Sequence, residues 1–193
     1  MIKMIVLSLL IVWGCRYLYI NHGNLCAYPR CPIEDYRLND IVEFGDNYSG
    51  FQDSLTGYSI SLISYNVLTF DEFCKKYDKA PDDFMYQSDV YLEVNVNMEN
   101  HGELDTPVQI GGLFICGEDW YRSSDPYATA YANQISIEQL SGIALDPNTS
   151  STLKIIYCLQ KGNFPISRWN HFENERIWLI ATLAPVEKRI LLQ

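Results

Sequence analysis

Residues 88–99 read SDVYLEVNVNME, and this stretch decides the fold. Apolar side chains alternate along it without error with polar or aromatic ones. The apolar set is Val90, Leu92, Val94, Val96 and Met98, and the other set is Asp89, Tyr91, Glu93, Asn95 and Asn97. Because successive side chains of a strand point to opposite faces of a sheet, this pattern predicts a strand with one face in a core and one in water. Such one-sided burial is typical of an antiparallel sheet.

Further short strands are expected on both sides of this segment. Runs rich in β-branched and aromatic residues, bounded by turn residues, predict strands over 58–68, 107–116, 151–159, 176–183 and 186–192. Gly111 and Gly112 indicate a bulge in the second of these. The polar segments 117–134 and 162–175 are expected to be connections, and 136–140 one helical turn. Short strands separated by turn signals predict a mainly β protein, a β-sandwich.

One short helix is expected between the first two strands, over 69–79. Thr69 and Glu72 have the spacing of a capping box, which begins a helix. Acidic residues stand in its first turn and lysines in its last turn, as the helix dipole favours. Pro81 ends it. The helix is therefore an insertion into the sandwich.

The first twenty residues contrast with everything that follows. Residues 4–15 (MIVLSLLIVWGC) are an apolar run with one Ser, flanked by Lys3 and Arg16. A helix that spans a bilayer needs about twenty apolar residues, so this run suits the core of a signal peptide better. Extended to Ile20, the run is long enough for an uncleaved signal anchor if the Arg16 side chain reaches the interface.

Three interpretations of this segment stay open. No small-residue A-x-A site follows the run, which disfavours ordinary signal cleavage and favours the anchor. The sequence of residues 12–15, VWGC, resembles a bacterial lipobox, so Cys15 is a candidate lipidation site. A buried core helix of a cytosolic protein is the third interpretation, and the abrupt change in polarity disfavours it. We expect localisation at the cell membrane, with an extracytoplasmic soluble domain.

The chain is expected to divide into three parts. Residues 1–20 form the signal-anchor or lipoprotein signal segment. Residues 21–56 are an extended tether, because Pro, Gly, Asn and Asp interrupt any periodicity there, with room for a short strand near 40–44. Residues 57–193 form the β-sandwich domain, which is long enough to build one core.

The chain is acidic, with 24 Asp and Glu, 14 Lys and Arg and a formal net charge of −10. All 24 acidic residues follow residue 20 together with 12 of the basic ones, so the soluble part carries −12. A domain this acidic repels nucleic acid, and no nucleic-acid partner is expected. The expected partners are the membrane, through the N-terminal segment, and a protein or an envelope glycan.

The chain has six cysteines: Cys15, Cys26, Cys31, Cys74, Cys116 and Cys158. Cys26 and Cys31 are close enough in sequence to close a small loop. Cys116 and Cys158 each fall in an expected strand and could cross a sandwich. Buried free thiols are the alternative, and we favour it for Cys74, Cys116 and Cys158. With no CxxC and no His at ligand spacing, neither a metal site nor a cofactor is expected.

The order of elements resembles the telokin-like, immunoglobulin-fold domains found behind signal or anchor segments in Firmicutes, and within them an uncharacterised family of about this length. The resemblance rests on VYLEVNVNMEN (90–100), GLFICGEDWY (112–121) and LDPNTSSTLKIIYCL (145–159), and covers about residues 55–192. It implies an immunoglobulin-like antiparallel β-sandwich, here with one inserted short helix, of unknown function. The Asp-x-Gly turn that such domains often show is replaced by residues 118–120, EDW. A fold does not fix a function, and the resemblance supplies no catalytic residues.

Candidate catalytic and metal-binding residues are few. Cys158 with His171 is the one nucleophile–base pair we consider, although a buried strand thiol and a loop histidine explain both residues more simply. The acidic groups at 82–89 and at 118–125 do not match a calcium-binding loop, so we interpret them as solvated loop acids. Asn47 and Asn148 match the glycosylation pattern by chance.

Aromatic residues in the expected connections are the best candidates for ligand contacts, because rings bury a large area at low entropic cost. The candidate ligand-binding residues are Trp120, Tyr121, Tyr127, Tyr131 and Trp169. The alternative is that these rings cap the ends of the sandwich core.

We therefore expect a non-catalytic, membrane-anchored extracytoplasmic module that binds its partner through loop surfaces. One alternative is a small cell-envelope hydrolase that uses Cys158 and His171. The other is a structural subunit of an envelope complex.

Overall fold

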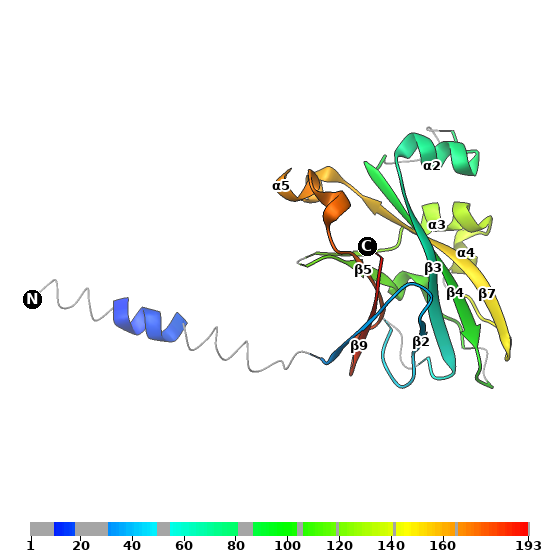
Figure 1. The fold of residues 1–193 in the computed structure, drawn as a ribbon, viewed down its shortest axis with the longest axis horizontal. Coiled ribbons are helices and arrows are strands. Elements are labelled where there is room, and N and C mark those ends of the chain that lie inside the picture. Colours follow the sequence, from blue (N-terminus) through cyan, green and yellow to red (C-terminus); the bar gives the residue numbers. More distant parts are fainter. Residues whose placement is uncertain are drawn as a thin grey trace, which may run out of the picture. The chain divides into compact units, whose positions relative to one another are not determined.

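A computed structural model of the chain describes residues 10–17, 31–49, 55–80, 87–103, 106–118, 120–140, 142–164 and 166–192. The chain divides into two units, Met1–Cys31 and Pro32–Gln193 (Figure 1). In the first unit residues 10–17 are helical, and their apolar side chains are exposed. The Trp13 and Tyr17 rings stack with their centroids 5.7 Å apart. No helix of the described residues has the length and apolar character needed to span a bilayer.

The second unit is a β-sandwich of two sheets with short helices. The strands are β1 (Ile33–Tyr36), β2 (Ile41–Glu43), β3 (Tyr58–Leu68), β4 (Val90–Asn100), β5 (Phe114–Cys116), β6 (Tyr121–Ser123), β7 (Thr149–Leu159), β8 (Trp178–Thr182) and β9 (Glu187–Leu191). One sheet has the order β1-β9-β8-β5-β6, and the other has the order β2-β3-β4-β7. All pairings are antiparallel except that of β1 with β9.

Seven short helices and 3-10 turns join these strands in the described part of the chain. They are α2 (Phe70–Tyr77), η2 (Ile110–Gly112), α3 (Pro126–Asn133), α4 (Ile137–Leu140), η3 (Lys161–Asn163), α5 (Ile166–Trp169) and η4 (Phe172–Asn174). The expectation of one inserted helix is therefore wrong. α2, α3 and α4 lie beside β3, β4 and β7, whereas α5 lies at one end of the sandwich (Figure 1).

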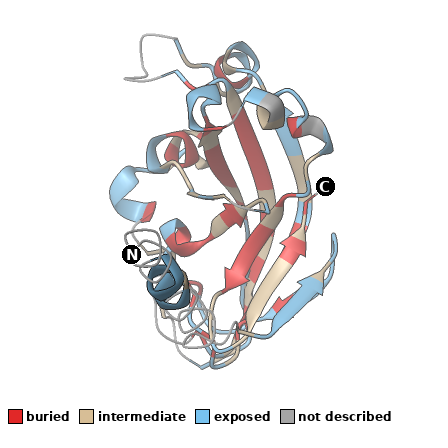
Figure 2. Ribbon diagram, turned by 90° about the vertical axis from the view of Figure 1, so that its left-hand side faces the viewer, coloured by how far each residue is buried: buried red, intermediate tan, exposed pale blue. Residues whose placement is uncertain are grey.

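The core between the sheets confirms the alternation along 88–99. Leu92, Val94, Val96 and Met98 are fully buried in the central cluster, together with apolar residues of β3, β7 and β8. Figure 2 shows this burial running along the middle of the strands. The hydroxyl of the buried Tyr157 is satisfied, because it donates to the carbonyl of Leu113 at 2.9 Å.

The face of β4 that points away from the core was expected to contact water, but other side chains cover it. Tyr91 and Glu93 are each 1% exposed. A second apolar cluster lies on this face, and its buried members are Phe73, Tyr91, Ala128, Ala132 and Ile156. Because α2 and α3 supply three of these residues, the sheet has a helical layer outside it.

α2 forms where the capping signal predicted a helix. The Thr69 hydroxyl accepts from the backbone N–H of Glu72, and the Glu72 carboxylate accepts from the backbone N–H of Thr69 at 2.8 Å. Phe73 stacks on Tyr91 with ring centroids 4.5 Å apart. The helix ends at Asp78, whose left-handed backbone reverses the chain.

α3 and β6 lie in the segment 117–134, where a connection was expected. The Asp125 carboxylate caps α3 by accepting from the N–H of Ala128 at 2.8 Å. Pro126 stands at the first helical position, where its fixed φ favours a helix and its missing N–H costs nothing. The signal Asp-Pro was thus present in the sequence.

α3 also satisfies the free edge of β7. The Asn133 side chain bonds both the N–H of Lys154 at 3.0 Å and its carbonyl at 2.6 Å. The Thr129 hydroxyl accepts from the N–H of Ile156 at 3.0 Å, and the N–H of Asp125 donates to the carbonyl of Ile156 at 2.7 Å. An open strand edge invites pairing with another chain, and these contacts close it.

Three further segments differ from expectation. In 107–116 the two glycines do not form a bulge but belong to η2, which leaves β5 with three residues. The connection 162–175 contains η3, α5 and η4. Within the expected tether 21–56, β1 and β2 belong to the two sheets, and Val42 and Phe44 lie in the core; residues 21–30 and 50–54 lie outside the described residues.

The described cysteines are free thiols. Ile115, Tyr157 and Leu159 face the core, so their neighbours Cys116 and Cys158 point out of opposite sides of the sandwich and cannot meet across it. The disulfide alternative is therefore wrong, and the favoured expectation of thiols outside disulfides at Cys74, Cys116 and Cys158 is confirmed. The proposed Cys26–Cys31 loop involves Cys26, which lies outside the described residues.

Candidate functional site

The five aromatic candidates separate into two groups. Trp120 and Trp169 belong to a cluster of rings at the α5 end of the core. Trp120 meets Phe164 edge-on with centroids 5.2 Å apart, and Trp169 lies 5.5 Å from Phe164 and 5.7 Å from Phe172. For these two tryptophans the arrangement matches the alternative interpretation, in which the rings cap the core.

A buried carboxylate fixes this cluster. The Trp120 indole N–H donates to Glu175 at 2.8 Å, and Arg168 contacts the same Glu175 oxygen at 2.9 Å. A Cβ at Gly117 would overlap both the indole and that carboxylate, so this position requires glycine. The ion pair and His171 line a depression of about 690 Å³ that is open to solvent.

Tyr121 and Tyr127 are exposed, at 73% and 59%. Tyr121 lies on the edge strand β6 and contacts Phe114 edge-on. Tyr127 and Tyr131 stand one turn apart on α3, and therefore on one face of that helix. Tyr131 lines a groove between α2 and α3.

This α2–α3 groove has a volume of about 550 Å³. Its lining comes from the last turn of α2, the last turn of α3 and the residues that follow each helix: Lys76, Tyr77, Asp78, Lys79, Ala130, Tyr131, Gln134 and Ile135. Two lysines, one aspartate and two phenol rings thus border one hollow.

Lysine side chains lie over the two tyrosine rings of the groove. The Lys79 ammonium is 4.3 Å from the centroid of Tyr131. Lys154, from β7, lies 5.3 Å from the centroid of Tyr77, and Lys76 lies 5.9 Å from the same ring. Such cation–π contacts hold the lysines against the rings and order the groove without neutralising their charge.

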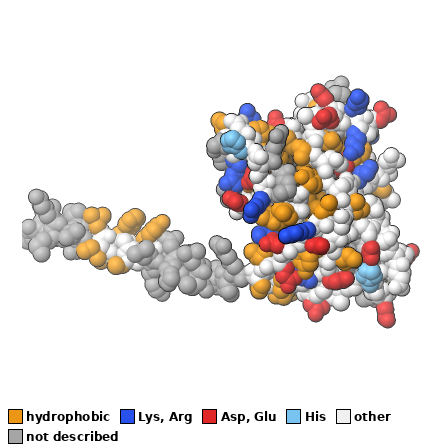
Figure 3. Space-filling view, viewed as in Figure 1, with side chains coloured by type: hydrophobic (Ala, Val, Ile, Leu, Met, Phe, Trp, Pro, Cys, Tyr) orange, Lys and Arg blue, Asp and Glu red, His pale blue; other side chains and the backbone are white. Residues whose placement is uncertain are grey.

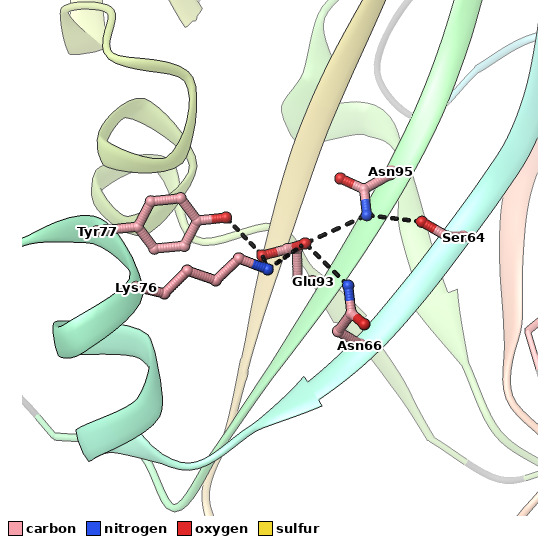
Figure 4. A network of polar contacts seen from close by, with 6 residues as sticks. All are labelled: Ser64, Asn66, Lys76, Tyr77, Glu93 and Asn95. Atoms are coloured by element: carbon pink, nitrogen blue, oxygen red, sulfur yellow. Dashed lines mark hydrogen bonds and ion pairs between the residues drawn. The ribbon is translucent and has the colours of Figure 1, made fainter.

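An ion pair between an exposed lysine and a buried carboxylate ties α2 to the sheet beneath it (Figure 4). Lys76 contacts both carboxylate oxygens of Glu93, at 2.8 and 3.0 Å. The Tyr77 hydroxyl donates to Glu93 at 2.5 Å. The Asn66 and Asn95 amides donate to the same carboxylate at 3.0 and 3.2 Å, and Asn95 also donates to Ser64.

The electrostatics of this network follow from its donors. Burial favours the neutral acid and opposes ionisation of Glu93, but hydrogen bonds from Lys76, Tyr77, Asn95 and Asn66 outweigh it, and the pKa of Glu93 is lowered. Burial, followed by the bond to Glu93, raises the pKa of Tyr77. Glu93 is therefore an ionised acceptor that fixes the position of α2.

The family comparison covers this whole arrangement. The profile of a domain of unknown function, DUF5028, matches residues 33–188. This range begins at the first residue of β1 and ends inside β9, so it includes both sheets, α2 and α3. The chain belongs to the DUF5028 family.

Solved structures of uncharacterised proteins are similar to this chain at low identity. The yjhA protein from Bacillus subtilis is 12% identical with a TM-score of 0.45, covering 82% of this chain and 99% of that one. A conserved hypothetical protein from Bacillus anthracis is 10% identical with a TM-score of 0.46, covering 80% and 96%. An uncharacterised β-sandwich protein from Clostridium difficile is 10% identical with a TM-score of 0.39, covering 86% and 99%. No curated protein matches the chain.

In the DUF5028 domain Cys158 and His171 are not partners. Burial raises the pKa of the Cys158 thiol, and Asp125 raises it further, whereas His171 is not among the groups that act on it. A catalytic thiol needs a lowered pKa or an adjacent base. His171 lines the depression beside Arg168 and Glu175.

No group of three or more metal-binding side chains occurs among the residues that the structure describes. Of the acidic groups weighed as calcium sites, Asp82, Asp83 and Asp119 lie outside the described residues. Asn47 is buried and its amide donates to the carbonyl of Phe44, so it is already engaged in the fold.

The DUF5028 domain thus has a candidate site that sequence reasoning found only in part. Tyr131 was among the expected ligand-binding residues, whereas Lys76, Lys79, Lys154 and Tyr77 were not. The available signal was the cluster of lysines at the end of α2 in an otherwise acidic chain. Those lysines were explained by the helix dipole, and nothing in the sequence placed Lys154 beside them.

Proposed function

We propose that the DUF5028 domain is a non-catalytic, extracytoplasmic binding module, anchored in the cell membrane by its N-terminal segment. Its ligand, a protein or an envelope glycan, binds in the α2–α3 groove, with Tyr127 and Tyr131 as contact residues. Trp120 and Trp169 act through the scaffold, because they are packed into the ring cluster rather than presented to a ligand.

The observation that carries this proposal is the pair of unneutralised lysines over the groove rings. Within the described part of the chain, neither Lys79 nor Lys154 has a carboxylate partner. In a domain with a net charge of −12 after residue 20, charge neutralisation would be easy to achieve. Aromatic rings with a few fixed polar or charged groups around a hollow are the usual lining of a ligand site.

The anchor is supported by the first unit. Apolar side chains of residues 10–17 are exposed, including Trp13 at 66%. An exposed apolar surface of this kind marks a contact with a membrane or another protein. Cys15 is exposed on the same helix, as lipidation requires.

The immunoglobulin-like assignment is supported by one sheet. Its strands β9, β8, β5 and β6 are antiparallel and form one layer of a two-sheet sandwich, which is the architecture of such domains. In the other sheet β4 lies between β3 and β7. This strand carries Glu93, which holds α2 beside the groove.

Cosedimentation of the full chain, in neutral detergent, with cell walls of Bacillus subtilis tests the proposal. Replacing Tyr127 and Tyr131 with Ser should release the protein into the supernatant. Tyr48→Ser is the matched control, because Tyr48 is 51% exposed and lies away from α2 and α3. Equal sedimentation of all three proteins would overturn the groove as the binding site.

A further inference from the structure

The second half of β3, residues 63–68, is an open sheet edge, which we name the β3 edge. β2 pairs only with residues 59–61 of β3, and the N–H of Asn39 donates to the carbonyl of Leu62 at 2.9 Å. Beyond that bond, no described residue bonds the backbone of β3 on this side. On its other side the β3 edge pairs with β4, after a register shift at its first residue. Because an antiparallel strand turns its N–H and C=O groups alternately to its two sides, the β3 edge leaves backbone groups free to pair.

The other outer edges of the two sheets are protected against pairing. β1 carries Glu34 and Asp35. β2 and β6 have three residues each and carry Glu43 and Arg122. α3 covers the edge of β7. Charges, short strands and covering helices are the usual means by which proteins prevent edge-to-edge association. β3 has no charged residue from Tyr58 to Leu68, so within the described part of the chain the β3 edge is the one open edge that is both long and uncharged.

The side chains of the β3 edge are suited to a strand partner. Ile63 and Val67 are β-branched and are 41% and 45% exposed. Ser64 and Asn66 are held by side chains of β4, in the network around Glu93 (Figure 4). The strand is therefore ordered before it binds, which lowers the entropy cost of pairing.

The charge of the domain indicates which partner fits this edge. The chain carries −12 after residue 20, and acidic side chains are spread over the face drawn in Figure 3. Two copies repel wherever such surfaces meet, so a contact between copies requires an uncharged surface. A cationic partner would instead be attracted to the acidic surfaces. The uncharged β3 edge therefore fits a second copy of this chain.

Antiparallel pairing makes the β3 edge complementary to itself. A two-fold axis through Tyr65 places Ser64 opposite Asn66 of the second copy, and Ile63 at the level of Val67 of the second copy. Polar side chains then meet polar ones and apolar side chains meet apolar ones, as cross-strand pairs favour. We propose that two copies of this chain pair antiparallel along the β3 edge. The two four-stranded sheets then continue into each other across the dimer.

The test is sedimentation of the full chain in neutral detergent, at protein concentrations from about 1 μM to about 1 mM. The wild type should change from monomer to dimer across this range. Amides of the β3 edge should exchange hydrogen more slowly in the dimer, as measured by NMR, because they become bonded. Ile63→Lys with Val67→Lys should weaken the dimer at least about tenfold, because like charges then lie opposite each other across the pair. Both side chains are exposed, so the domain tolerates the change.

Tyr121→Lys with Ile137→Lys is the charge-matched control, since both side chains are exposed and lie on β6 and α4. An equal loss of dimer in this control would mean that net charge and not the β3 edge governs association, and would overturn the inference. A dimer that persists in Ile63→Lys with Val67→Lys would place the contact elsewhere in the chain. A wild type that stays monomeric throughout would also overturn the inference and leave the edge to an extended segment of another protein. Cell-wall cosedimentation tests the proposed function separately from all of these outcomes.

Discussion

Glu93 is the residue on which the helical layer depends. A carboxylate with 1% exposure is tolerated because Lys76, Tyr77 and two Asn amides surround it. The two-residue alternation along 88–99 correctly predicts that Glu93 lies on the face of the sheet opposite the core. It could not show that α2 would cover that face, because a period assigns faces and says nothing of what packs on them.

Glu93→Gln is expected to lower the free energy of unfolding by about 1–3 kcal/mol at neutral pH, because the charged partners lose their acceptor. The lowered pKa means that this stabilisation is present above the ordinary carboxyl pKa and is lost as the pH falls through the lowered value. The difference between wild type and variant should therefore narrow as the pH falls below the ordinary carboxyl pKa and through the lowered pKa of Glu93. Urea unfolding across this range measures it. A constant difference, or an equal effect of the exposed control Glu103→Gln, would contradict the account.

Cys116 and Cys158 are expected to resist alkylation in the folded protein. Burial raises the pKa of Cys116 to about 11, and that of Cys158 is raised as well, so little thiolate exists at neutral pH. Modification should be at least about a hundredfold slower than in the urea-unfolded chain. Mass spectrometry of iodoacetamide-treated peptides gives the rates, with exposed Cys15 as the internal reference. Fast modification of Cys158 in the folded chain would revive the thiol-hydrolase hypothesis.

Among the elements, α3 combines two roles. It closes the edge of β7 through Thr129 and Asn133, and it presents Tyr127 and Tyr131 on another face. The strand pattern and the capping box of α2 could be predicted from the sequence because each signal is local. α3 is not predicted by periodicity, because its Ala and Thr residues give no strong apolar period, and the capping pair Asp125–Pro126 is its only local signal.

Asn133→Ala is expected to lower the free energy of unfolding by about 1–3 kcal/mol, because the N–H and carbonyl of Lys154 lose their partner. Hydrogen exchange of the Lys154 and Ile156 amides should accelerate, and the open edge should promote self-association. Exchange measured by NMR and light scattering together test this. Asn163→Ala, in η3, is the control; unchanged protection at Lys154 in Asn133→Ala would show that α3 does not hold the edge.

At the scale of the whole molecule, the main difference between the sequence prediction and the structure is where the folded domain begins. The family match begins at Ile33, and the second unit begins at Pro32. The sequence placed the start of the domain at 57, because β1 and β2 are too short to carry a pattern. Their place is set by pairing with β9 and β3, which are distant in sequence.

Limited proteolysis of the full chain should yield a resistant fragment that begins near Pro32, because β1 is held in the sheet by β9 and by the Asp35–Arg189 pair at 2.5 Å. Mass spectrometry of the fragments identifies the ends. Arg189→Ala should make cleavage at β1 faster, whereas Arg122→Ala should not. Early cleavage between β1 and β2 in the wild type would indicate that these residues belong to an extended tether and not to the folded domain.

Crosslinking in intact cells tests the central claim most directly, that the α2–α3 groove contacts an envelope ligand. A photoreactive benzophenone amino acid placed at Tyr127, at Tyr131 and, as an exposed control, at Tyr48 would be irradiated in the full chain. The account predicts a discrete adduct of higher mass from the two groove positions, lost on adding Lys79→Gln and Lys154→Gln, and none from position 48. Adducts at all three positions alike, or at none, would contradict it.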